Sequence, residues 1–269
     1  MRYIYYILML CAIVALTACE ELIDVNLNDS DPKIVIVADL YNGAGAQEVR
    51  VSRTVNFDAE QNYAPVENAQ VYVRTGPGQL YGFNQQERGQ YVNTQIPMEV
   101  GQSYTLEVHV DDQQFTSQSV MLPYIEIDSL GLTKENIFDE TYYFVNLKFQ
   151  DPEGQSDYYR YRVSLNGAPF VFSTAMSDKF NDGNQVTHQI GAPDDMELKP
   201  GDDLRIRRAI INKDVYRYWS EYQSTNPGSA APGNPTSNIS NGALGYFSVS
   251  HIKEYAVTVE ELEEESDLE

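Results

Sequence analysis

The chain has 269 residues and a formal net charge of −22, with 40 acidic and 18 basic side chains. A surface this acidic repels phosphate backbones, so nucleic acids are excluded as partners. The length suits two ordinary domains or one large all-β unit, and the 20 tyrosines are typical of half-buried strands and of interfaces.

Arg2 is the only charged side chain among the first 18 residues, and the run from Ile4 to Leu16 is nearly all apolar. The run is shorter than a spanning helix and ends in small residues, as secretory signal peptides do. Its end, Leu16-Thr17-Ala18-Cys19, resembles the bacterial lipobox. The resemblance implies a lipoprotein signal peptide over residues 1–18 and acyl chains, palmitate among them, that attach Cys19 to a lipid bilayer. The alternative is an ordinary cleaved signal with an incidental cysteine.

Cysteine usage limits how the mature chain can be stabilised. Cys11 lies inside the predicted signal peptide, so Cys19 is the one cysteine that remains after cleavage. The mature chain therefore has no internal disulfide, and we expect buried surface to hold it together.

Residues 19–32 are predicted to form an acidic tether. They carry five acidic residues and no basic one, and Pro32 ends the segment. Glu20 and Glu21 resemble the acidic export signal that directs lipoproteins of Bacteroidota to the outer face of the outer membrane. The alternative is a solvated spacer.

Residues 33–122 are predicted to form an immunoglobulin-like β-sandwich, because short runs with a period of two recur between turn residues. The segment 33–40 (KIVIVADL) contains a continuous β-branched run, as expected of a strand covered on both faces, and Asp111-Asp112 marks the turn of a hairpin. Strands are expected within 33–40, 48–57, 69–75, 80–83, 89–93 and both arms of 100–123. Their order resembles small immunoglobulin-like modules of carboxypeptidase-regulatory type, which implies a spacer or docking role.

Residues 123–259 are predicted to form a second antiparallel β domain with one helix. Strand patterns occupy 124–132, two runs within 141–167, 198–211 and 251–262, and Val215, Tyr218, Trp219 and Tyr222 have helical spacing. The helix is expected over about 212–224, with Asn212 or Asp214 as its cap. A long Pro- and Gly-rich loop follows over 226–242, of a kind that is usually functional or disordered. Residues 260–269 are an acidic tail.

A search for catalytic chemistry gives no candidate. The chain has no His-Glu-x-x-His motif, no Gly-x-Ser-x-Gly elbow and no cysteine nucleophile after cleavage. The isolated histidines are His109, His188 and His251, and the paired turn aspartates are Asp111-Asp112, Asp194-Asp195 and Asp202-Asp203. We therefore predict no enzyme activity, no cofactor and no metal site, although a weak surface calcium site and a pair of meeting carboxylates stay open.

Two groups of residues are candidates for ligand binding. Arg205 and Arg207 share one strand face, and Arg160 and Arg162 share another, which favours either an anion-binding strip or cross-strand pairing with acidic residues. The second group is an aromatic platform for a sugar, and its alternative is a helix docked on a sheet. The platform would consist of Trp219, Tyr218, Tyr222, Tyr246 and Phe247.

The sequence motifs that are most specific for a protein family lie around the long loop. A helix with Tyr-Trp is followed by Gly-Asn-Pro, by Ser-Asn-Ile and by Gly242-Ala243-Leu244-Gly245-Tyr246-Phe247. Together with the lipobox, "KIVIVADL", "ENAQVYV" and "GQYVN", this resembles the domain-of-unknown-function 4249 family of Bacteroidota outer-membrane lipoproteins. The resemblance implies a non-enzymatic, surface-facing, lipid-anchored accessory or ligand-binding partner of a TonB-dependent transporter in nutrient uptake. The alternative is a free-standing surface module that binds glycans or peptides or acts as an adhesin.

Overall fold

The computed structural model describes residues 31–43, 45–56, 63–137, 140–192, 196–225 and 233–262. The predicted signal peptide, Cys19, Glu20, Glu21, residues 226–232 of the long loop and the end of the acidic tail lie outside the described residues. The helical structure within these ranges falls short of the length and hydrophobicity that are needed to span a membrane.

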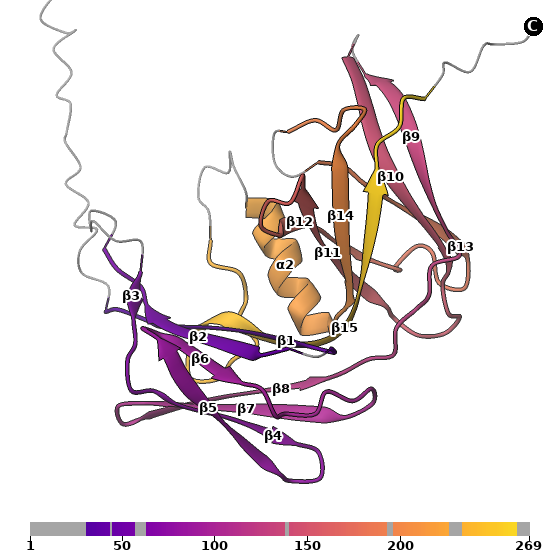
Figure 1. Ribbon diagram of the computed structural model, residues 1–269. Coiled ribbons are helices and arrows are strands. Elements are labelled where there is room, and N and C mark those ends of the chain that lie inside the picture. Colours follow the sequence, from indigo (N-terminus) through magenta and orange to yellow (C-terminus); the bar gives the residue numbers. More distant parts are fainter. Residues whose placement is uncertain are drawn as a thin grey trace, which may run out of the picture. The chain divides into compact units, whose positions relative to one another are not determined.

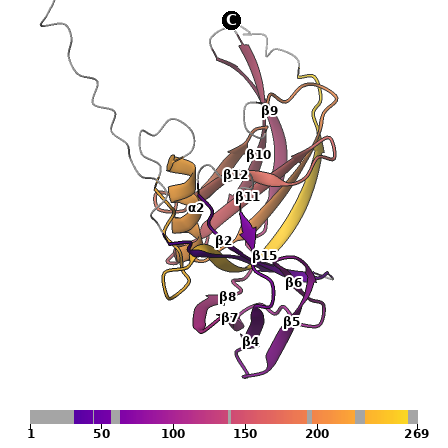
Figure 2. The ribbon, with the colours of Figure 1, turned by 90° about the vertical axis from the view of Figure 1, so that its left-hand side faces the viewer.

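The described chain is mainly β, as the sequence predicts, and contains two β-sandwiches (Figures 1 and 2). The first contains β1 (Ile34–Tyr41), β2 (Gln47–Arg53), β3 (Ala64–Pro65), β4 (Gln70–Thr75), β5 (Leu80–Glu87), β6 (Gln90–Asn93), β7 (Ser103–Val110) and β8 (Gln113–Val120). The second contains β9 (Ser129–Ile137), β10 (Glu140–Gln150), β11 (Tyr158–Leu165), β12 (Val171–Ser177), β13 (Gln185–Ile190) and β14 (Asp203–Ile210). The helix α2 (Lys213–Thr225) and the strand β15 (Leu244–Thr258) complete the chain.

One large sheet runs through both sandwiches. In the described part of the chain, its strands follow the order β12-β11-β14-β15-β1-β2-β6-β5-β4-β7-β8, and β3 pairs with β2. Because β5 pairs with both β6 and β4, the sheet turns there and supplies the second layer of the first sandwich. A separate sheet of β13, β10 and β9 supplies the second layer of the other sandwich.

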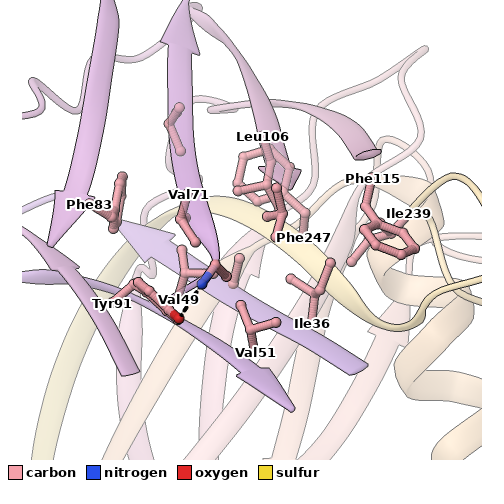
Figure 3. Close-up of a cluster of buried hydrophobic side chains, with 14 of the residues drawn as sticks. Ile36, Val49, Val51, Val71, Phe83, Tyr91, Leu106, Phe115, Ile239 and Phe247 are labelled. Atoms are coloured by element: carbon pink, nitrogen blue, oxygen red, sulfur yellow. Dashed lines mark hydrogen bonds between the residues drawn. The ribbon is translucent and has the colours of Figure 1, made fainter. Parts of the chain in front are cut away.

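The core of the first sandwich follows from the period-two pattern (Figure 3). Ile36, Val49 and Leu106 are fully buried in it. The buried hydroxyl of Tyr91 donates to the carbonyl of Val66 and accepts from the N–H of Ala69, both at 2.8 Å, which fixes the segment before β4. The expectation that both faces of residues 33–40 are covered is wrong. One face of β1 is buried, and every second side chain, on the other face, is only half-buried.

The strand β15 belongs to both sandwiches. Its first half, Leu244–Ser250, pairs with β1 in parallel, and its second half, His251–Thr258, pairs with β14 in antiparallel fashion. Phe247 and Val249 pack in the first core, whereas Val257 packs against the second. The predicted division at residues 122 and 123 places this strand in the second domain alone, and the structure shows that it also contributes to the first core.

The second core lies between the sheet of β13, β10 and β9 and the strands β12, β11, β14 and β15. The runs within 141–167 form β10 and β11, which lie in different sheets and face each other. Phe149 on β10 contacts Tyr159 on β11, with ring centroids 5.2 Å apart. A fully buried arginine, Arg208, lies among these rings, with its guanidinium carbon 4.4 Å from the Phe149 centroid and 4.6 Å from that of Tyr159.

Burial beside Arg208 makes the protonation of His188 depend on folding. Arg208 Nε donates to the hydroxyl of Tyr161, and this hydroxyl lies 2.7 Å from Nδ1 of His188. Burial, reinforced by the charge of Arg208, lowers the pKa of His188 from its ordinary 6.5 to about 4. The folded chain therefore keeps His188 neutral at a pH where the unfolded chain protonates it.

We expect acid to destabilise the parent chain more than a His188→Gln variant. Stability linked to His188 is complete above pH 6.5 and is lost as the pH falls to about 4. The loss over this window is roughly 3 kcal/mol, since one pKa unit corresponds to about 1.4 kcal/mol. Urea unfolding at several pH values measures it, and parallel curves for parent and variant would contradict the expectation.

The predicted helix is confirmed as α2, which covers one face of the large sheet (Figure 1). Its buried Val215 packs with Ala209, Ile211 and Tyr246 on that face. The amide of Asn212 donates to Oγ of Ser119 and to the carbonyl of Val120, and this ties the start of α2 to β8. We refer to the side of the sheet that α2 covers as the helix face.

Candidate functional site

The four arginines singled out from the sequence lie on the helix face. Strands β11 and β14 are paired so that Arg162 is opposite Arg207, and Arg160 and Arg205 are their neighbours on the same face. Sequence alone placed these arginines on two separate faces. The pairing of β11 with β14 brings them together beside α2.

Arg160 forms the buried ion pair at the centre of this face. Its Nη2 donates to both carboxylate oxygens of Asp39 on β1, at 2.7 and 3.0 Å. Burial alone would lower the pKa of Arg160, but the carboxylate of Asp39 more than reverses this, so the pKa is raised. Asp39 was not predicted as a site residue, although an acidic residue two positions after the β-branched run Ile34 to Val37 was a usable signal.

Arg205 and Arg207 both pair with Glu254 on β15, which confirms the expected cross-strand pairing. The guanidinium of Arg207 also stacks on Phe170, 4.0 Å from its ring centroid. Nε of Arg207 is buried and has no hydrogen-bond partner among the described residues. Arg207 therefore keeps one free donor after its protein contacts are made.

Arg162 has no carboxylate partner in the described ranges. One of its nitrogens, Nη2, donates to the carbonyl of Phe170 at 2.7 Å, and the ion pairs of the described residues do not include it. Burial, together with the nearby charge of Arg160, lowers its pKa, and Asp39 opposes this. A second anion at this position would compensate a charge that the described residues leave unpaired.

Trp219 on α2 forms the aromatic side of the site. Phe172 on β12 stacks on its ring at 4.4 Å between centroids, and Tyr246 meets it edge-on at 5.3 Å. The guanidinium carbon of Arg160 lies 5.6 Å from the centroid of the same ring. Nε1 of Trp219 is buried and, like Nε of Arg207, lacks an acceptor in the described part of the chain.

These side chains line a cavity of about 490 Å³ on the helix face. Its wall contains Val37, Asp39, Tyr41, Ala46, Glu48, Arg50, Arg162, Phe172, Arg207, Trp219 and Tyr246. We call this the arginine–aromatic cavity. Apolar rings beside guanidinium groups with unused donors suit a small organic anion that carries an apolar part. Asp39 and Glu48 are each paired with an arginine, and their negative charges would repel an anion on their side of the cavity. An anion would therefore bind on the side of Arg162 and Arg207.

The predicted ligand-binding residues divide into three groups. Trp219, Tyr246 and Arg207 line the cavity. Arg205 and Tyr222 are not part of the cavity wall. Tyr222 is exposed near the end of α2, and its ring contacts that of Trp219. The prediction is wrong for Phe247, because its side chain is fully buried in the core of the first sandwich, on the opposite face of β15.

The aromatic residues of α2 pack against the sheet, so they dock the helix. This arrangement is the alternative to a sugar platform. The ring centroid of Tyr218 lies 4.9 Å from that of Tyr246 and 5.6 Å from that of Trp219, so the rings contact one another. Tyr158 of β11 stacks on Tyr216 in the same layer, at 4.9 Å. The rings pack the helix against the sheet, and Nε1 of Trp219 has no acceptor among the described residues.

We expect Trp219→Ala to lower the free energy of unfolding by roughly 2–3 kcal/mol, because a stacked and partly buried indole is lost. Trp219→Phe keeps most of the packing and removes the unpaired N–H, so a loss of about 1 kcal/mol or less is expected. Chemical denaturation of the two variants measures both. Equal losses would show that the ring contacts at this position do not contribute to stability.

A second hollow of about 670 Å³ lies along α2, next to the loops after β10 and β12. It is lined on one side by Lys213 and Arg217 and on the other by Asp178 and Asp182. The residues that line this second hollow do not include any of the described residues that have a buried donor without a partner. Two such residues, Arg207 and Trp219, line the arginine–aromatic cavity. We therefore regard the smaller cavity as the better candidate for a small ligand.

One comparison with known proteins gives a match. The model of the family described as Domain of unknown function (DUF4249) matches residues 20–256. No curated protein matches the chain. The matched range includes every strand of both sandwiches up to residue 256, the helix α2 and the whole arginine–aromatic cavity.

Proposed function

The chain belongs to the DUF4249 family, and on this premise we propose that it is a non-enzymatic outer-membrane lipoprotein that binds a small organic anion as the partner of a TonB-dependent transporter. The ligand would be a nutrient or part of one, held in the arginine–aromatic cavity. The lipid anchor at Cys19 would keep this cavity beside the transporter.

The observation that carries the proposal is the guanidinium of Arg162, which is part of the cavity wall and has no carboxylate partner in the described ranges. An anion in the cavity would supply the counter-charge that this half-buried group lacks there. The rings of Phe172 and Tyr246 supply apolar contact beside it.

Membrane attachment rests on the sequence, since Cys19 lies outside the described residues. Leu16-Thr17-Ala18-Cys19 is the lipobox-like text, and the acidic Glu20 and Glu21 follow it directly. Three acyl chains at about 0.8 kcal/mol per buried CH₂ would hold the chain on the membrane almost irreversibly. We propose that the protein faces the cell surface.

Replacing Cys19 tests the anchor separately from the cavity. Cys19→Ser should lose palmitate labelling and leave the membrane on washing with carbonate, while its folding stays intact because no described core residue changes. Charge reversal at Glu20 and Glu21 should make the anchored protein resistant to protease added to whole cells. A Cys19→Ser protein that stays in the membrane after the wash would contradict the lipoprotein proposal.

Ligand binding is tested by thermal unfolding of the full chain in mild detergent with a panel of probes. The panel contains uronic acids, dicarboxylates and aromatic carboxylates, each with its neutral analogue. At least one anion should raise the melting temperature, and its neutral analogue should not. Arg162→Gln should weaken the apparent affinity for that anion by ten- to a hundredfold, since a hydrogen bond to a charged group contributes about 1.5–3 kcal/mol.

Arg88→Gln is the matched control for this experiment. Arg88 pairs with Glu67 at an exposed position outside the cavity, so this substitution removes one positive charge without changing the cavity wall. The control should bind the anion as the parent does. Equal weakening in both variants would mean that only the overall charge matters, and no response to any anion in the panel would contradict anion binding in the cavity.

A further inference from the structure

Two loops of the second sandwich meet at one edge and bring together aspartates that are far apart in the sequence. The first loop, 151–157, connects β10 to β11, and the second, 178–184, connects β12 to β13. The N–H of Asp151 donates to the carbonyl of Asn184 at 2.9 Å, and the N–H of Asp178 donates to the carbonyl of Asp157 at 3.1 Å. Each loop therefore holds the other in place through its backbone.

Three carboxylates converge between these loops. One oxygen each from Asp151, Asp178 and Asp182 lies within 4.8 Å of the other two. Asp151 and Asp178 are 1% and 5% exposed, so water screens their repulsion poorly. The ion pairs of the described residues include none of the three, so no lysine or arginine neutralises them there.

A second observation shows that the cluster lacks a positive partner. Oδ1 of Asp151 accepts from the hydroxyl of Tyr159 at 2.8 Å, whereas Oδ2 is buried and has no hydrogen-bond partner in the described part of the chain. A buried carboxylate oxygen without a partner is costly unless it binds a cation.

The surrounding hydrogen bonds orient the carboxylates as ligands. The N–H of Gly154 donates to Oδ1 of Asp182, and the N–H of Asp157 donates to Oδ2 of Asp178, both at 2.8 Å. Each of these carboxylates keeps one oxygen that is not used in these bonds. The side chain of Asp157 accepts from Gln155 at 2.9 Å and adds a fourth negative charge close to the cluster.

We propose that Asp151, Asp178 and Asp182 bind a calcium ion that joins the loop between β10 and β11 to the loop between β12 and β13. Calcium takes six to eight oxygen ligands at about 2.3–2.6 Å, so two oxygens on one ion lie at most about 5 Å apart, as these do. Zinc and copper would require histidine or cysteine ligands, which the cluster does not contain. Magnesium keeps most of its waters and rarely uses three protein carboxylates.

This ion would stabilise the second sandwich, because each loop connects the two layers of that sandwich. Calcium sites in extracellular modules have dissociation constants of about 10⁻⁴–10⁻³ M. At 10 mM calcium, such a site should raise the melting temperature by roughly 3–10 °C. The site is independent of the arginine–aromatic cavity, so its failure would leave the proposed function unaffected.

The experiment uses the full chain, purified in mild detergent and freed of metal with EDTA. Melting temperatures are compared without metal, with 10 mM CaCl₂ and with 10 mM MgCl₂. Asp182→Asn, at an exposed position, should abolish the rise with calcium without harming the fold. Asp112→Asn changes an exposed aspartate in the turn between β7 and β8 and should respond to calcium as the parent does.

Asp151→Asn provides a second readout if Asp182→Asn proves ambiguous. Without metal it should melt at the same temperature as the parent or higher, because repulsion within the cluster is relieved, and calcium should have no effect on it. Terbium provides a third readout, since the phenol of Tyr159 bonds to Asp151 and should sensitise emission from an ion bound there.

Three outcomes would overturn the proposal. The first is no calcium-dependent rise in the parent, and the second is an equal rise in Asp182→Asn and Asp112→Asn. The third is an equal response to magnesium, which would contradict the assignment to calcium. If the melting temperature instead rises as the pH falls and calcium has no effect, a shared proton neutralises the cluster and no ion binds.

Discussion

Gly245→Ala is expected to lower the free energy of unfolding by about 2–6 kcal/mol. Gly245 has a φ of +90° and pairs with Ile36 where β15 begins its parallel pairing with β1. A Cβ at Gly245 would lie 2.0 Å from the carbonyl oxygen of Ile36 and 2.8 Å from its carbonyl carbon. The backbone strain and the forced separation of the two strands each cost about 1–3 kcal/mol.

Gly242→Ala is the matched control, since it lies in the same motif and also has a positive φ, +71°. A Cβ there would meet nothing within 4 Å, so only the backbone strain of about 1 kcal/mol is expected. Urea unfolding of both variants measures the difference. Similar losses would contradict the claim that β15 and β1 require their close approach at Gly245.

The second large effect is expected at the buried ion pair. Asp39→Ala should cost about 3 kcal/mol, because it leaves the guanidinium of Arg160 buried without its counter-charge. The side chains of Arg160 and Asp39 are only 4% and 18% exposed, so water compensates little. Removing Glu67 from its exposed pair with Arg88 should cost at most about 1 kcal/mol.

A double variant separates the loss of the pair from the loss of packing. Asp39→Ala combined with Arg160→Met removes both charges and keeps most of the volume of Arg160. Replacing a whole buried pair by apolar groups is often neutral, so we expect the double variant to recover most of the stability lost in Asp39→Ala. A double variant as unstable as Asp39→Ala would mean that the loss does not come from the unpaired charge of Arg160.

The strands and the helix were predictable because each buries one face of a regular pattern. In "EVRVSRTVNF", Val49 and Val51 alternate with polar residues and are buried in β2, as the alternation predicts. Val215 and Trp219 have helical spacing, and α2 contacts the sheet through them. Local periodicity of this kind reflects burial directly, so it can be read without knowing the strand partners.

The pairing partners of β15 were not predictable, since an alternating sequence pattern does not tell which strands are neighbours. The segment from Leu244 to Thr258 is one continuous strand, yet its two halves pair with β1 and β14 in opposite directions. The signal that we left unused is Gly245 directly before Tyr246 and Phe247. A glycine inside a strand pattern marks a close approach of another backbone.

The cavity and the aspartate cluster both depend on strand order. Arg162 and Arg207 were singled out separately, and only the pairing of β11 with β14 places them opposite each other. Asp151 and Asp178 are in separate loops that cross between the same two sheets, so their meeting cannot be seen in either segment alone. Aspartates in turns usually cap the backbone, so the sequence does not mark Asp151 or Asp178 as metal ligands.

We propose that this chain is a lipoprotein and works together with a TonB-dependent transporter. This proposal is tested most directly by capturing the tagged full chain from outer membranes in mild detergent and identifying its partners by mass spectrometry. Cells are grown on several nutrients, and another tagged outer-membrane lipoprotein provides the background. We predict that one transporter barrel is recovered with this chain and not with the control. Recovery of no transporter under any growth condition would contradict the account and favour a free-standing surface binder.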